Sequence, residues 1–149
     1  MRLRNYRPQD CREIMQLFRN TVHTVNAGDY SPEQLDAWAP ENMDAAQWNH
    51  SLMEHFTVVA VDDDGKIIGF GDIDAAVYLD RLFVHAMHQG QGIASAICDQ
   101  LEKSAAGTVT THASVTARLF FEGRGYRGIR QQTVWRNGLS LTNFVMKKG

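Results

Sequence analysis

The sequence predicts an α/β (α+β) fold in which helices flank a mixed sheet. Three observations lead to this prediction. Apolar residues recur every three or four positions in the first third of the chain, whereas from residue 57 onward short Val- and Ile-rich runs alternate with turn residues. A further helical pattern, 91–105, separates two of the later strands. No repeat or Pro/Gly/Ser-rich linker interrupts the chain, so we expect one domain over residues 1–149.

A short strand, 2–6, and an amphipathic helix open the chain. The helix begins after Pro8, and its apolar residues follow the spacing i, i+3, i+4, i+8 and i+11, which places them on one face. These residues are Ile14, Leu17, Phe18, Val22 and Val25. We predict that this face packs into the core.

Two shorter helices follow. Ser31 and Gln34 form a capping-box pattern with Pro32 at the first helical position, and this helix is expected to stop near Pro40. Asp44 with Gln47 repeats the capping pattern. The helix after it carries one apolar face at four-residue spacing, made of Trp48, Leu52 and Phe56.

The remaining elements are mostly strands. Strands at 57–61, 66–71 and 77–85 form a meander, and the helix 91–105 ends at Gly107. A strand at 108–113 and a helix at 116–124 follow. The chain closes with a hairpin that turns at Asn137 and Gly138, a strong two-residue turn signal. The predicted order is βαα(α)βββαβαββ.

The composition limits the possible functions. With 15 basic and 17 acidic side chains and a formal charge of −2, the chain has no overall field that attracts nucleic acid or anionic lipid, so we expect neither partner. The N-terminus lacks a signal-like apolar segment, and no run of about 18 apolar residues occurs, which favours a cytoplasmic protein. Cys11 and Cys98 lack metal-ligand spacing and are predicted to be packing residues, with no metal site.

The segment 89–95, Gln-Gly-Gln-Gly-Ile-Ala-Ser, carries the strongest chemical signal. It follows a β-rich run and opens a helix. The first amides of a helix have no internal partner and lie at the positive end of the helix dipole, so they bind phosphate groups. Gly90 and Gly92 let the backbone approach a ligand closely and adopt positive φ.

Three phosphate-binding patterns can be compared with this segment. A P-loop requires Gly-Lys-Ser/Thr, which is absent. A dinucleotide fingerprint requires an acidic residue about 20 positions further on, and the region around Thr110 and Thr111 has none. The pattern Q/R-x-x-G-x-G/A fits, with Gln89, Gly92 and Ala94 in the defined positions.

A second motif lies about 25 residues further on. Residues 116–126 resemble the pattern A-x-x-F-Y-x-x-x-G-F, with Phe121 in the place of Tyr. Both motifs are similar to those of the GCN5-related N-acetyltransferase (GNAT) superfamily, and the segments 111–114 and 141–146 resemble its YafP-like branch. The resemblance covers nearly the whole chain. It implies the GNAT fold, a mixed and mostly antiparallel sheet of six to seven strands flanked by about four helices.

The resemblance also implies acetyl-CoA as cofactor. The backbone of Leu82 and Val84 is expected to bond the pantetheine arm as a substitute strand, the amides of 89–95 to hold the pyrophosphate, and the helix after residue 116 to flank the thioester. The expected cofactor-binding residues are Leu82, Phe83, Val84, Gln89, Gly90, Gln91, Gly92, Ile93, Ala94, Ser95, Ala117, Phe120 and Phe121. The implied reaction is acetyl transfer to a primary amine by direct attack in a ternary complex.

The catalytic roles follow from the same resemblance. Asp80 is the first candidate for the general base and Tyr78 shares its strand, where alternation is expected to place both on the face of Leu82 and Val84. Other candidate bases are His23, His85 and His112. Phe121 has no proton for the leaving thiolate, which leaves that role vacant or assigned to Ser114, Tyr126 or water.

The acceptor site is expected between the first helix and the first hairpin strand. Its candidate residues are His23, Asp29, Tyr30, Trp38 and His112. We expect a small-molecule amine as acceptor and a monomer or homodimer. Three alternatives stay open: a protein or peptide lysine acetyltransferase, a non-catalytic acyl-CoA sensor or partner-binding module, and nucleotide binding at the glycine loop.

Overall fold

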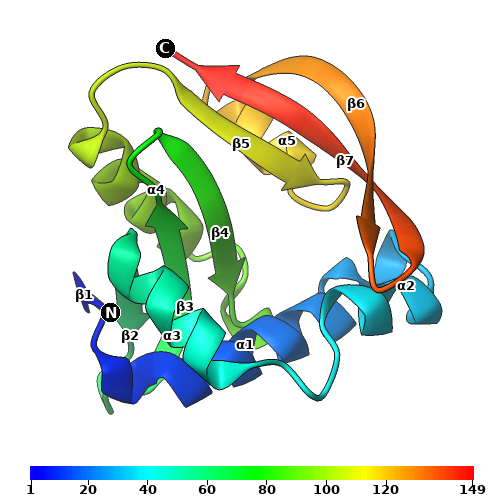
Figure 1. The fold of residues 1–149 in the computed structure, drawn as a ribbon. Helices are drawn as coiled ribbons and strands as arrows, with labels where there is room; N and C mark the ends of the chain where they lie inside the picture. The colour runs from blue at the N-terminus through cyan, green and yellow to red at the C-terminus, as the bar shows by residue number, and fades with distance from the viewer.

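The structure is a computed structural model that describes residues 1–149. A seven-stranded sheet in the order β1-β2-β3-β4-β5-β7-β6 forms the centre of the molecule (Figure 1). Neighbouring strands are antiparallel except for the parallel pair β4–β5. The strands are β1 (Arg2–Asn5), β2 (Phe56–Val61), β3 (Ile67–Ile73), β4 (Tyr78–Val84), β5 (Val109–Ser114), β6 (Arg127–Arg136) and β7 (Leu139–Lys148).

Helices cover both faces of this sheet. They are α1 (Cys11–Thr24), α2 (Pro32–Trp38), α3 (Ala45–Glu54), α4 (Ile93–Ser104) and α5 (Arg118–Gly123). One core cluster joins α1, α2 and α3 to the first face, and the other joins α4 and α5 to the opposite face. None of the helices combines the length and the apolar character that crossing a bilayer requires.

The order of elements confirms the order predicted from the sequence. The Ser31 hydroxyl accepts a hydrogen bond from the Gln34 amide at 3.1 Å, and the Gln34 side chain accepts one from the Ser31 amide at 2.8 Å, so the capping box is present. Asn137 and Gly138 both have positive φ, as a two-residue hairpin turn requires. Both cysteines are buried and unpaired.

The predicted apolar face of α3 is wrong at one residue. The helix ends at Glu54, and Phe56 starts β2 with 37% of its surface exposed. The Thr57 hydroxyl donates to the carbonyl of Leu52 at 2.7 Å, and Phe56 pairs with Ile73 of β3. Pairing with the sheet therefore outweighs the helical spacing.

Two glycines of β3 let α4 lie close to the sheet. A Cβ atom added to Gly71 would stand 2.9 Å from Ile97 Cγ2 and 3.1 Å from the Arg81 carbonyl oxygen. One added to Gly69 would stand 3.1 Å from Ile93 Cγ2. The N-terminal half of α4, where the glycine loop ends, is thus fixed tightly against β3.

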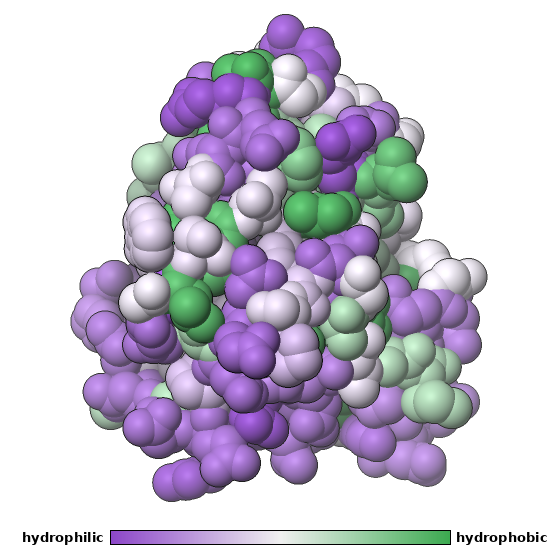
Figure 2. Space-filling model, turned by 90° about the vertical axis from the view of Figure 1, so that its right-hand side faces the viewer, coloured by the Kyte–Doolittle hydropathy of each residue, from purple (hydrophilic) through white to green (hydrophobic).

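The surface on the side of α2, β6 and β7 is mixed in polarity. Figure 2 shows apolar residues in separate patches among hydrophilic ones on this face. Trp135, Leu139 and Ile129 are among the exposed large hydrophobic residues of the hairpin. A scattered distribution of this kind is ordinary for a surface in contact with water.

Candidate active site

A cleft of about 480 Å³ opens where β4 and β5 separate. These two parallel strands are paired only at Tyr78↔Thr110 and Leu79↔Thr111, and beyond this point they diverge in a V (Figure 1). The cleft is lined by the whole of β4, by residues of β5, β6 and β7, and by residues of α1, α2, α3 and α5. The open edge of β4 is therefore available to a ligand.

The backbone of β4 presents hydrogen-bonding groups along this open edge. The His85 amide donates to the Ile68 carbonyl at 2.8 Å, so the next pair along, Gly69 and Val84, is a non-hydrogen-bonded pair of the antiparallel ladder. Val84, and Leu82 two residues earlier, consequently direct their N–H and C=O groups away from β3 and toward the cleft.

The glycine loop at the end of the cleft carries unpaired amides. Gly90 and Gly92 have φ values of +74° and +80°, and α4 starts at Ile93. The seven peptide N–H groups of residues 89–95 have no hydrogen-bond acceptor within the protein, and the first amide of the helix with one is Ala96. The Gln89 side chain donates to the Val84 carbonyl at 2.6 Å and so ties the loop to β4.

Asp80 lies on a bulge of β4. Asp72 pairs with Arg81 and Ile73 with Leu79, so Asp80 is an extra residue relative to β3. The bulge breaks the alternation of side chains along the strand. Leu79 packs toward α4, as Leu82 and Val84 do. The carboxylate of Asp80 instead lies on the opposite face, near the side chains of His55 and Asp72.

The predicted orientation of Tyr78 and Asp80 is thus wrong, although both residues line the cleft. Tyr78 turns to the ring of His112, with ring centroids 4.9 Å apart. Burial raises the pKa of Tyr78 to about 12. Burial, and then the charge of Asp72, raise the pKa of the Asp80 carboxyl above its usual range, while Arg81 and His55 oppose this effect.

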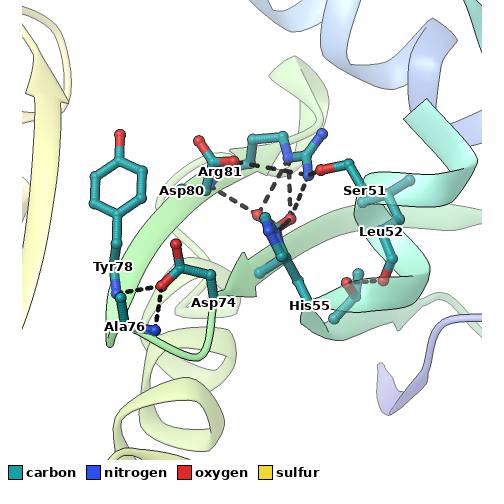
Figure 3. A network of polar contacts seen from close by, with 10 residues as sticks. Ser51, Leu52, His55, Asp74, Ala76, Tyr78, Asp80 and Arg81 are labelled. Carbon is teal, nitrogen blue, oxygen red and sulfur yellow. Dashed lines mark hydrogen bonds and ion pairs between the residues drawn. The ribbon is translucent and has the colours of Figure 1, made fainter. Parts of the chain in front are cut away.

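A polar network next to Asp80 is centred on Asp72, and Figure 3 shows its labelled members His55, Ser51 and Arg81. It is fully buried and accepts hydrogen bonds from His55 Nδ1 at 2.8 Å and from the amide and guanidinium of Arg81. Arg81 also donates to Ser51 Oγ at 2.7 Å, and its guanidinium carbon lies 4.9 Å from the ring centre of Trp48. The hydrogen bond to Asp72 raises the pKa of His55.

The same cluster brings three potential metal ligands together. Ligand atoms of His55, Asp72 and Asp80 lie within 4.8 Å of one another. The Asp72 oxygens, however, already bond Arg81 and His55, and a guanidinium in the group repels a cation. The arrangement fits a hydrogen-bonded network that fixes Arg81, whose Nη2 lies 3.8 Å from Asp80 Oδ2. Sequence reasoning missed Asp72 and His55. The one signal that could have indicated Asp72 is that it is an acidic residue next to a run of apolar strand residues.

A comparison with known proteins identifies the family. The family model for the acetyltransferase (GNAT) domain matches residues 26–148. The chain belongs to the GCN5-related N-acetyltransferases. It is 33% identical over 147 residues to the uncharacterized N-acetyltransferase YafP of Escherichia coli K12, covering 99% of this chain and 95% of the relative.

Solved structures of GNAT proteins have the same fold. A GCN5-related N-acetyltransferase from Rhodopseudomonas palustris superposes with a TM-score of 0.94 at 34% identity, covering 99% of this chain and 94% of the other. The PaiA N-acetyltransferase of Thermoplasma acidophilum, solved in complex with coenzyme A, superposes with a TM-score of 0.78 at 15% identity, covering 99% and 97%. The GNAT fold, predicted with six to seven strands and about four helices, is confirmed, and the structure has seven strands and five α-helices.

The predicted cofactor residues fall into two groups in this GNAT cleft. Those whose atoms line it are Leu82, Phe83, Val84, Gln89, Ala94, Ala117, Phe120 and Phe121. Those outside its lining are Gly90, Gln91, Gly92, Ile93 and Ser95. Ile93 is a core residue, so its contribution to a phosphate site is limited to its backbone N–H.

The candidate acids differ in position. Ser114 lines the GNAT cleft, and its hydroxyl accepts a hydrogen bond from the Ala117 amide at 3.0 Å. Tyr126 does not line the cleft; it is buried and its hydroxyl donates to Glu102 Oε2 at 2.8 Å. Burial, and then this hydrogen bond, raise the pKa of Tyr126 well above its usual range. The prediction of Tyr126 as proton donor is therefore withdrawn.

The candidate histidine bases are separated in the same way. His112 lines the GNAT cleft, and burial followed by the charge of Arg130 lowers its pKa. His23 lies outside the cleft, where its Nε2 is 2.9 Å from the Ala39 carbonyl. His85 is also outside and accepts a hydrogen bond from the Met87 amide at 3.0 Å. Of the three candidate histidine bases, His112 alone lines the cleft.

The predicted acceptor residues are partly brought together. Tyr30, Trp38 and His112 line the cleft, whereas His23 and Asp29 do not. The Asp29 carboxylate instead accepts a hydrogen bond from the Thr116 hydroxyl at 2.7 Å, so its predicted place in the acceptor site is corrected. Lining residues outside the expected acceptor segment, which sequence reasoning missed, include Phe18, Thr21, Arg81, Val134, Arg136, Leu141, Thr142 and Asn143.

Proposed function

We propose that this chain, as one domain over residues 1–149, transfers the acetyl group of acetyl-CoA to the primary amine of a small molecule. The observation that carries the proposal is the row of seven unpaired amides at 89–95 beside the open edge of β4. Together they offer a site for a diphosphate and a strand-like edge for an amide-containing arm. Coenzyme A contains both groups, and the structurally similar PaiA protein was solved with it.

In the proposed complex both features bind the cofactor at once. The pyrophosphate accepts hydrogen bonds from the loop amides, and the pantetheine arm bonds the backbone of Leu82 and Val84. The apolar side chains of Ala117, Phe120 and Phe121 line the same cleft and contact the end of the arm. The thioester then lies near the bulge that carries Asp80.

Asp80 is the proposed general base. Its carboxylate accepts a proton from the ammonium group of the acceptor, and the neutral amine then attacks the thioester carbonyl. The new C–N bond forms and the C–S bond breaks; the attacking nitrogen then loses its second proton, which passes through Ser114 or water to the departing thiolate. The products are an N-acetyl amide and the free thiol, with the first proton left on Asp80. A carboxyl whose pKa is raised serves better as a base near neutral pH than an ordinary exposed one.

Loop binding is tested by calorimetry with acetyl-CoA. Gly92→Glu places a carboxylate in the proposed diphosphate site, and we expect binding to be lost while the circular-dichroism spectrum stays unchanged. Gly65→Glu is the matched control, because Gly65 also has positive φ and open space but lies in the β2–β3 turn. Unchanged affinity in Gly92→Glu would refute the proposal.

Catalysis is tested separately with Asp80→Asn. We expect kcat/KM to fall about 10²- to 10⁴-fold in an assay of free thiol release, with acetyl-CoA affinity retained. In the wild type, activity is expected to fall as the pH drops through the raised pKa of Asp80, because protonation removes the base. Tight acetyl-CoA binding with no turnover across amino acids, amines and peptides would instead support a non-catalytic sensor, a reading that Phe121 in place of Tyr keeps open.

A further inference from the structure

The charges that line the cleft are few and nearly balanced. Its lining contains one carboxylate, Asp80, and two guanidinium groups, Arg81 and Arg136. Arg81 is bound to the buried carboxylate of Asp72, which compensates its charge, and its Nη2 makes only a longer contact of 3.8 Å with Asp80 Oδ2. What remains is a negative charge at Asp80 and a positive charge at Arg136.

Arg136 has no acidic partner in the protein. It lies at the end of β6, at the rim of the cleft, and its only side-chain hydrogen bond is to the carbonyl of Trp135 at 3.1 Å. It lines the same cleft as Asp80, Tyr78 and His112. A cation so placed attracts an anionic group of a bound molecule.

Two polar side chains of the cleft lack partners as well. The hydroxyl of Thr21 has no hydrogen bond although the residue is only 4% exposed, and the buried side-chain oxygen of Asn143 has none either. Both residues line the cleft. Buried polar groups are rarely left unpaired in proteins, and those of a binding site are satisfied by the ligand.

The rest of the acceptor side is aromatic and apolar. Phe18 contacts the rings of Trp38, Trp48 and Phe83 at centroid distances of 6.3, 4.9 and 4.9 Å. Trp38, Trp48 and Phe83 are half-buried, so parts of their surfaces remain available. This wall suits an apolar or aromatic body.

We propose that the acceptor is a zwitterionic monoamine of the amino acid type with an apolar or aromatic side chain. Its amine meets Asp80, its carboxylate meets Arg136, and Thr21 and Asn143 bond its remaining polar atoms. A polyamine or an aminoglycoside fits less well, since a polycation needs several carboxylates and the cleft offers one. This inference rests on the proposed acetyl transfer.

The carboxylate is tested with matched substrate pairs. Thiol release from acetyl-CoA is measured with phenylalanine against phenethylamine and with leucine against isopentylamine, and spermidine serves as a polycation. We expect kcat/KM to be at least tenfold higher for the carboxylate-bearing member of each pair. Arg136→Gln is expected to bring the ratio of kcat/KM within each pair close to one, and a ratio that stays above tenfold would overturn the role of Arg136. Arg127→Gln, an exposed change on the same strand, should retain it.

The neutral contacts are tested with Thr21→Val. The variant keeps the side-chain shape and is expected to raise KM for the acceptor several-fold while KM for acetyl-CoA stays constant. Thr24→Val is the control, because its hydroxyl bonds the Asn20 carbonyl on the same helix instead of lining the cleft. An acceptor KM unchanged by Thr21→Val would overturn the role of Thr21.

The two proposals fail in different ways. Turnover of phenethylamine or spermidine equal to or better than that of the amino acids, with coenzyme A bound, would overturn the acceptor class alone. Absence of acetyl-CoA binding would overturn the proposed function with it.

Discussion

Replacing Asp72 by Asn is expected to destabilise the protein strongly. The carboxylate is fully buried and is bonded by His55 and by both the amide and the guanidinium of Arg81. Asn has nearly the same shape, but it leaves the half-buried Arg81 without its counter-charge and replaces one acceptor by a donor. Removing one partner of a buried ion pair costs about 3–5 kcal/mol.

This free energy corresponds to a large change in melting temperature. For a domain of this size, 1 kcal/mol shifts Tm by about 2–4 °C, so we expect Asp72→Asn to lower Tm by about 6–20 °C. Scanning calorimetry at neutral pH measures the shift, and Asp63→Asn, at a fully exposed side chain, is the control. The double variant Asp72→Asn/Arg81→Gln should lose less than the sum of the single variants.

The same variant changes the titration of His55. The hydrogen bond to Asp72 raises the pKa of His55 in the folded state, so its stabilising effect is present at low pH and is lost as the pH rises through that pKa. In Asp72→Asn, the pKa of His55 measured by NMR is expected to fall. A Tm within about 2 °C of the wild type, together with an unchanged His55 pKa, would refute the idea that the Asp72 side chain holds the network.

Three further predictions concern packing, the missing acid and pH. Gly71→Ala is expected to lower the free energy of unfolding in urea by about 1–3 kcal/mol, because its Cβ would meet Ile97 at 2.9 Å; Gly123→Ala, with open space, should be near neutral. Phe121→Tyr is expected to change kcat by less than tenfold, and a larger rise would show that the absent acid limits the rate. Burial raises the pKa of the Glu102 carboxyl, but hydrogen bonds from Arg124, Lys148 and Tyr126 outweigh burial and lower this pKa below its usual range. The stabilisation that Glu102 contributes is therefore lost as the pH falls through the lowered pKa, and Glu102→Gln should flatten the fall of Tm in acid.

Features with local signals were predicted well from the sequence. The capping box at Ser31, the turn at Asn137 and the glycine loop each depend on residues within a few positions, so their residue types suffice. The fold follows from such elements in their order. The glycine loop follows β4 directly in the sequence, so its position at the end of this strand was also predicted.

Features that depend on tertiary contacts were not predictable in this way. The side on which Asp80 lies is set by a bulge relative to β3, and a bulge depends on the register of two strands. Tyr126 fits the family pattern, yet its hydroxyl is held by Glu102 of α4, 24 positions away. Thr21, Arg136 and Asn143 come from opposite ends of the chain, and nothing in their local sequence marks them as neighbours in one cleft.

The short pairing between β4 and β5 has a consequence for stability. Two paired positions join the four strands on one side to the three on the other, so the sheet is nearly interrupted at its middle. A molecule bonded along the free edge of β4 then supplies contacts that another strand supplies elsewhere. At a concentration 100 times its Kd such a molecule adds about 2.7 kcal/mol to the free energy of unfolding. Resistance to heat and proteolysis would thus track the cellular supply of the ligand.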